Sequence, residues 1–274
     1  MTASEAPEPR LPPPPFAPPP PDRWCDLVLT GGVVSGVLYP AAIGELARHY
    51  RFHALGGTSV GAIAAAITAA AEYQRRLGSD AGFDVLARLP ANLAEPVPSP
   101  QGRVREVTRG IEPQPTTLLS LFQPATPAGV RLLRLFLASQ PGQPAPRGWQ
   151  RLRAAMGGLW RAYPLALLAP ALVLALVPLL SLVLAGAVGF LAFLAALPLA
   201  LLVGPLVLVV QLLWDLRSGL LGNHFGLCTG LGQPGAGKGL TDWLHDAIQW
   251  AAGRLSHETP MTFRDLAEAP EGEL

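Results

Sequence analysis

The chain has 274 residues, with 20 Lys and Arg against 19 Asp and Glu, so its formal net charge is +1. Charged residues make up 14% of it, against about 25% in ordinary soluble domains, and hydrophobic residues make up 50%. The absence of a basic excess argues against a nucleic-acid partner, and the apolar content argues against a mainly disordered chain. The two cysteines, Cys25 and Cys228, have no metal-binding spacing and form no disulfide framework. No residue cluster implies a metal or an organic cofactor.

Residues 1–23 are rich in proline, with runs at 12–15 and 18–21. Proline lacks the N–H that helix and sheet hydrogen bonds require, so we expect a disordered leader that is largely polyproline II. A ligand for an SH3-type domain is the alternative. The leader has no apolar core typical of a signal peptide.

The next fifty residues alternate apolar runs with glycine turns. Residues 26–30 and 52–55 are short apolar segments typical of buried strands. Each precedes a glycine turn and a segment with helical spacing, at 37–50 and at 62–71. Strand, turn and helix in repetition predict an α/β fold with a parallel sheet. Residues 78–148 are less regular, and we expect loops and short helices there.

Residues 162–214 contain no charged side chain over 53 positions. One membrane span needs about 20 residues, so the length predicts a hairpin of two transmembrane helices within residues 161–215. The alternative is a helical hairpin buried in a soluble core. Arg residues flank the run on both sides, and the positive-inside tendency therefore predicts that both flanks are cytoplasmic. The flanking arginines are Arg147, Arg151, Arg153, Arg161 and Arg217.

After the hairpin, residues 216–274 return to a soluble composition, and residues 244–255 have the spacing of an amphipathic helix. We therefore expect residues 24–160 and 216–274 to be two parts of one domain. Before this helix, residues 232–239 nearly match a P-loop. This segment lacks the final Ser or Thr and has no strand before it, so we interpret it as a flexible loop.

The segment Gly57-Thr58-Ser59-Val60-Gly61 fits Gly-x-Ser-x-Gly, the nucleophile elbow that presents a serine hydroxyl on a tight strand-to-helix turn. The alternative is a glycine turn whose serine caps the helix. A second glycine segment, Gly31-Gly32-Val33-Val34-Ser35-Gly36, also follows a strand. Such a loop directs backbone N–H groups to one point, where a serine hydrolase binds the oxyanion of its intermediate. A phosphate-binding or purely structural turn is the alternative there.

Together these two segments resemble the patatin-like phospholipase family. The resemblance is carried by residues 26–36 and 52–61, and more weakly by 226–230, 240–244 and 260–266. It implies a three-layer α/β/α lipid acyl hydrolase of bacterial type. The resemblance does not explain the hairpin, which we interpret as an insertion that anchors the protein in the inner membrane, and the flanking arginines predict that the catalytic domain faces the cytoplasm. The resemblance also implies that Ser59 is the nucleophile and that the substrate is a membrane lipid. The N–H groups of Gly31, Gly32, Val33 and Val60 would then form the oxyanion hole.

The sequence departs from the family pattern in two places. Val33 and Ser35 occupy positions where the family usually has Gly and a basic residue. The chain also has no Asp-Gly dipeptide, which in the family supplies the catalytic Asp. We therefore expect a C-terminally incomplete domain or a catalytically inactive, lipid-binding membrane scaffold. A Ser-His-Asp hydrolase that recruits His245 or His257 is a further alternative.

Overall fold

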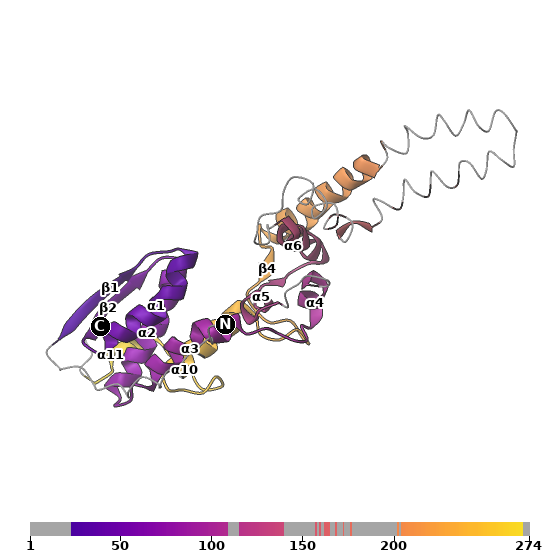
Figure 1. The fold of residues 1–274 in the computed structure, drawn as a ribbon. Coiled ribbons are helices and arrows are strands. Elements are labelled where there is room, and N and C mark those ends of the chain that lie inside the picture. The colour runs from indigo at the N-terminus through magenta and orange to yellow at the C-terminus, as the bar shows by residue number, and fades with distance from the viewer. Residues whose placement is uncertain are drawn as a thin grey trace, which may run out of the picture. The chain divides into compact units, whose positions relative to one another are not determined.

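The computed structural model describes residues 23–108, 115–139 and 204–270, together with positions 157, 159, 162–164, 168, 172, 176 and 202. The predicted leader and most of the predicted hairpin lie outside the described residues. The chain divides into two compact units, Met1–Ala94 with Trp243–Leu274, and Glu95–Asp242. Both combine helices with short strands (Figure 1).

The first unit begins with two strand–helix pairs, as the sequence predicts. Strand β1 (Trp24–Leu29) precedes helix α1 (Val33–Ala47), and strand β2 (Arg51–Gly57) precedes helix α2 (Val60–Arg76). The two strands pair in parallel, which confirms the predicted parallel arrangement. The strands run side by side along α1 and α2 (Figure 1). Because their carboxyl ends lie at one edge, the two glycine turns meet there.

Alternation along β1 shows which face of the sheet is covered. Leu29 is buried, whereas Val28 is 84% exposed. In the described residues the helices therefore pack on one face of the sheet. The three-layer arrangement stays a prediction.

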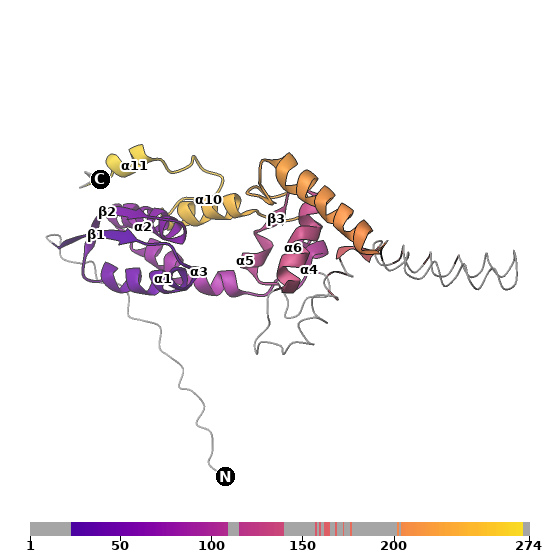
Figure 2. The ribbon, with the colours of Figure 1, turned by 90° about the horizontal axis from the view of Figure 1, so that it is seen from above.

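Helix α3 (Ala81–Ala94) and helix α10 (Leu240–Ala251) complete the packing of the first unit, followed by the short helix α11 (Phe263–Ala267). The predicted helix at 244–255 is confirmed as α10, although it begins and ends four residues earlier. Helix α10 comes from the far end of the chain, and its later turns pack beside α2 and α3 (Figure 2). Gly82 of α3 allows this approach, since a Cβ there would lie 2.3 Å from the Ala251 carbonyl oxygen.

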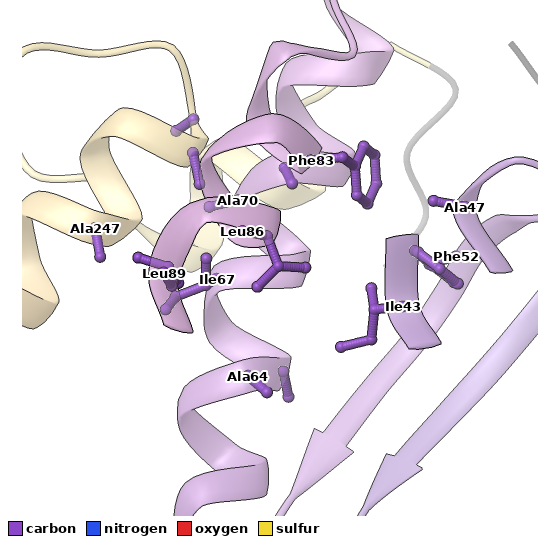
Figure 3. Close-up of a cluster of buried hydrophobic side chains, with 14 of the residues drawn as sticks. Ile43, Ala47, Phe52, Ala64, Ile67, Ala70, Phe83, Leu86, Leu89 and Ala247 are labelled. Atoms are coloured by element: carbon purple, nitrogen blue, oxygen red, sulfur yellow. The ribbon is translucent and has the colours of Figure 1, made fainter. Parts of the chain in front are cut away.

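Buried apolar side chains hold these helices and strands together. Phe52 of β2 lies against Phe83 of α3, with ring centroids 6.0 Å apart, and Ile43 and Ile67 are 1% exposed. Figure 3 shows these side chains converging between the helices and the sheet. The residues labelled there are Ile43, Ala47, Phe52, Ala64, Ile67, Ala70, Phe83, Leu86, Leu89 and Ala247.

The second unit is mainly helical. Its best-described long helices are α6 (Pro127–Ser139) and a helix over Gly204–Asn223. The latter ends in a π-helical turn, η1 (Leu216–Leu220), and a 3-10 turn, η2 (Leu221–Asn223). The thirteen-residue α6, like the fourteen-residue α3 of the first unit, is longer than the short helices expected in this part of the sequence. The smaller elements are α4 (Gly102–Thr108), α5 (Thr117–Ser120), β3 (Gln123–Pro124) and β4 (Cys228–Thr229).

Candidate functional site

Ser59 stands at a strained turn between β2 and α2. Strand β2 ends at Gly57 and α2 begins at Val60, with Ser59 at the N-cap position. Its backbone has φ 53° and ψ −126°, a conformation that costs a non-glycine residue about 1–3 kcal/mol. The Ser59 side chain makes no capping hydrogen bond to α2, so the interpretation as a helix-capping serine is wrong. Ser59 is exposed at this turn.

Both glycines of the segment stand where backbones pass too closely for a side chain. A Cβ on Gly57 would lie 2.4 Å from the carbonyl carbon and oxygen of Gly61. A Cβ on Gly61 would lie 2.2 Å from the Leu29 carbonyl oxygen at the end of β1. The two glycines therefore let the first turn of α2 sit directly on the ends of both strands.

The glycine loop after β1 lies beside the serine. A Cβ on Gly31 would lie 3.0 Å from Ser59 Cβ and 3.7 Å from Ser59 Oγ. The Gly31 N–H donates to Thr58 Oγ1 at 3.1 Å, and the Thr58 N–H donates to the Leu29 carbonyl at 3.0 Å. Gly32 has φ 148° and precedes the first residue of α1. The structure thus brings together the two segments that carry the predicted site.

The N-termini of α1 and α2 meet at this point, because Gly36 of α1 leaves room for Val60 of α2. A Cβ on Gly36 would lie 2.5 Å from Val60 Cγ1. The first N–H groups of a helix have no acceptor within that helix, so those of Val33 and Val60 have none within α1 or α2. They also contribute the positive end of each helix dipole. The Gly31 N–H, by contrast, is engaged by Thr58 in this structure.

In the part of the chain that the structure describes, no histidine or carboxylate forms a hydrogen bond with the Ser59 hydroxyl. His53 Nδ1 lies 3.4 Å from Asp26 Oδ1. His53 precedes Gly57 by four strand residues, which is about 13 Å at the rise of a β-strand. His245 Nε2 lies 3.1 Å from the Ser256 carbonyl oxygen. The general base for Ser59 is therefore not identified among these residues.

The Asp26–His53 pair is a feature that the sequence did not reveal. The pairing of β1 with β2 shifts register between Cys25 and Leu27, and the carboxylate of Asp26 there accepts a hydrogen bond from the Ala54 N–H at 3.1 Å. The contact depends on this irregularity. No residue spacing along the chain indicates it.

The loop that resembles a P-loop binds a side chain of its own unit. The N–H groups of Gly232 and Gly239 donate to Asp242 Oδ2 at 2.5 and 3.0 Å. The amide of buried Gln123 donates to the carbonyl oxygens of residues 236–238. Because the Asp242 carboxylate already accepts from these two N–H groups, the loop offers them to no phosphate.

Neither thiol has the character of a nucleophile. Burial raises the pKa of Cys25, and the carboxylate of Asp26 raises it further. Burial also raises the pKa of Cys228. Within residues 23–108, 115–139 and 204–270, no three His, Cys, Asp or Glu side chains cluster as metal ligands would.

The helix Gly204–Asn223 has the length and composition to cross a membrane, with a mean hydropathy of 1.3. Only 17% of its most apolar window is buried. This low burial argues against the alternative of a hairpin enclosed in a soluble core. The described residues show one such helix, and most of the other half of the predicted hairpin lies outside them.

Comparison with known proteins gives one informative relative. The chain is 38% identical over 274 aligned positions to a protein called RpoH suppressor from Rhizobium meliloti (strain 1021). The match covers 92% of this chain and 38% of the relative, so the chain spans well under half of that protein's length. No protein-family model matches the chain, and no solved structure matches it.

Proposed function

We propose that this chain is the nucleophile-bearing part of a membrane-anchored lipid acyl hydrolase similar to the patatin-like phospholipases. In this reaction Ser59 Oγ bonds to the carbonyl carbon of a lipid ester and loses its proton to a general base. Collapse of the intermediate breaks the bond to the alcohol, which leaves with a proton. Water then hydrolyses the acyl-serine. The name of the relative specifies no reaction, so the proposal stands on the geometry and the sequence pattern.

The observation that carries the proposal is the strained Ser59 turn with the Gly31 loop against it. Strain of this kind persists only where the surrounding structure holds it. Here the close contacts of Gly57 and Gly61 hold it, and the hydroxyl remains free of the capping bond that would otherwise explain a serine. The N–H groups of Val33 and Val60, which have no acceptor within their own helices, would then donate to the developing oxyanion. Losing one such donor typically costs about 3 kcal/mol of transition-state stabilisation.

The anchoring part of the proposal is a hairpin over residues 162–214 with both ends on the cytoplasmic side of the inner membrane. The exposed apolar helix Gly204–Asn223 supports its second half. Such an anchor would hold the site near the bilayer surface, where a lipid substrate is concentrated. An alkaline carbonate wash that releases the chain from vesicles would show that the anchoring part is wrong.

Labelling with a fluorophosphonate probe tests the nucleophile. The full chain in detergent should react, and Ser59→Ala should not. Ser79→Ala is the matched control, because Ser79 lies in the same unit on the exposed turn after α2, and it should react like the unmodified chain. Equal labelling of the Ser59→Ala variant would refute the assignment of Ser59.

A catalytically inactive, lipid-binding membrane scaffold is the second candidate. It is favoured by the lack of an Asp-Gly dipeptide in the sequence and of a base bonded to the Ser59 hydroxyl among the described residues. Without a base a serine hydroxyl is a weak nucleophile. If neither the chain nor the longer relative reacts with the probe, while both still bind lipid, the scaffold is the correct function.

A further inference from the structure

One face of the helix Gly204–Asn223 is fixed to the second unit near its end. Asp215 is 2% exposed and is bound by Arg131, whose Nε lies 2.7 Å from Asp215 Oδ2. One turn later Gly219 is buried, and a Cβ there would lie 2.8 Å from Ala128 Cβ of α6. Asp215 and Gly219 thus lie on the face of this helix that packs against α6.

A groove of about 490 Å³ lies along the end of the same helix. It is lined by Trp214, Arg217, Ser218, Leu221 and Gly222. Residues 214, 218 and 221 follow one another at helical spacing, and the intervening turn is π-helical, a form that is frequent at functional sites. Trp214 is 68% exposed and Leu221 is 56% exposed. The groove is therefore open to its surroundings at these two side chains.

Arg217 gives the groove its charge. Among the described residues it forms no ion pair, whereas the nearby Asp215 is neutralised by Arg131. The Ser218 hydroxyl donates to the Trp214 carbonyl at 2.8 Å, so the guanidinium is the charged side-chain donor that the groove offers to a ligand. A guanidinium binds phosphate through two parallel hydrogen bonds. Indole rings prefer the headgroup level of a bilayer.

We propose that this groove holds the phosphate of an anionic phospholipid, with Arg217 as its donor and Trp214 and Leu221 against the upper part of the acyl chains. The proposal rests on the membrane anchoring proposed above. Charge complementarity favours an anionic lipid, since the Arg217 guanidinium is exposed and has no ion-pair partner among the described residues. Continuity with the apolar helix surface favours a lipid phosphate over a free one.

The test compares the full chain in two sets of phosphatidylcholine vesicles. One set contains a minor fraction of brominated phosphatidylglycerol, and the other contains the same fraction of brominated phosphatidylcholine. Bromine quenches nearby tryptophan fluorescence, and subtracting the signal of Trp214→Phe isolates Trp214 among the six tryptophans. From the quenching of Trp214 we expect brominated phosphatidylglycerol to bind about fivefold more strongly than brominated phosphatidylcholine, which corresponds to roughly 1 kcal/mol for one Arg near an anionic surface. Arg217→Gln should abolish the preference.

Arg105→Gln is the matched control, because Arg105 is an exposed arginine of the same unit on α4, and it should keep the preference. Equal quenching by both lipids, or an unchanged preference in Arg217→Gln, would overturn the proposal. Complete loss of the preference on adding inorganic phosphate would identify a general phosphate site instead of a lipid site. Release of the chain by alkaline carbonate would instead show that the anchoring itself fails, which separates the two failures.

Discussion

Replacing Gly61 by alanine should separate the end of β1 from the start of α2. The new Cβ would lie 2.2 Å from the Leu29 carbonyl oxygen and 3.0 Å from that of Thr30. Ordinary contact needs about 3.5 Å, so strand and helix must move apart by about 1 Å. Both obstacles are backbone atoms, which no side-chain rotation relieves. Overpacking of this kind costs about 1–3 kcal/mol.

Gly44→Ala in α1 is the matched control, because a Cβ there meets nothing within 4 Å. In a helix interior this change gains up to about 1 kcal/mol. Urea unfolding of the full chain in detergent should therefore lower the midpoint for Gly61→Ala and raise it for Gly44→Ala. A displacement of about 1 Å at the turn should also slow fluorophosphonate labelling by about 100-fold. A midpoint for Gly61→Ala at or above that of Gly44→Ala would refute this account of the turn.

Three further predictions concern strain, a buried pair and a helix cap. In urea unfolding, the unfolding free energy of Ser59→Gly should exceed that of Ser59→Ala by about 1 kcal/mol, because only glycine adopts φ 53° without strain. Arg131→Met should lower the unfolding free energy by about 2–3 kcal/mol in the same assay, since it leaves the Asp215 carboxylate buried without its cation; Arg131→Lys should recover part of the loss. Two hydrogen bonds from Thr262 lower the pKa of Asp265 to about 2, and the bond from the hydroxyl contributes more than the bond from the backbone N–H. The Asp265 carboxylate therefore stabilises the folded state above its ordinary pKa near 4, and this contribution is lost as pH falls toward 2. Because Thr262→Ala removes the hydroxyl donor, NMR titration of the carboxylate should find the pKa of Asp265 raised in that variant.

The fold of the first strand–helix pairs could be predicted, because short-range sequence patterns determine where these strands and helices begin and end. Apolar runs that end at glycines indicate β1 and β2, and the structure confirms both and their parallel pairing. The contact of Gly31 with Ser59 follows from that pairing, since parallel strands end at one edge. The Asp26–His53 pair could not be predicted, because it depends on an irregularity of register. The inward orientation of Asp215 could not be predicted either, since it depends on α6, more than 70 residues earlier in the chain.

The inward orientation of Asp215 extends the exposed apolar surface of the helix Gly204–Asn223 beyond the end of the uncharged run in the sequence. In the sequence the uncharged run stops at Asp215, but this carboxylate faces α6, and the first outward charge is that of Arg217. Within the helix Gly204–Asn223, five large apolar side chains that precede Arg217 are at least half exposed, namely Leu206, Val209, Val210, Leu213 and Trp214. Fully burying such a side chain is worth about 1.5–3 kcal/mol, so leaving half of each in water forfeits about 5 kcal/mol. That is as large as the whole stability of many domains, and a bilayer in contact with this face is the environment that would recover it.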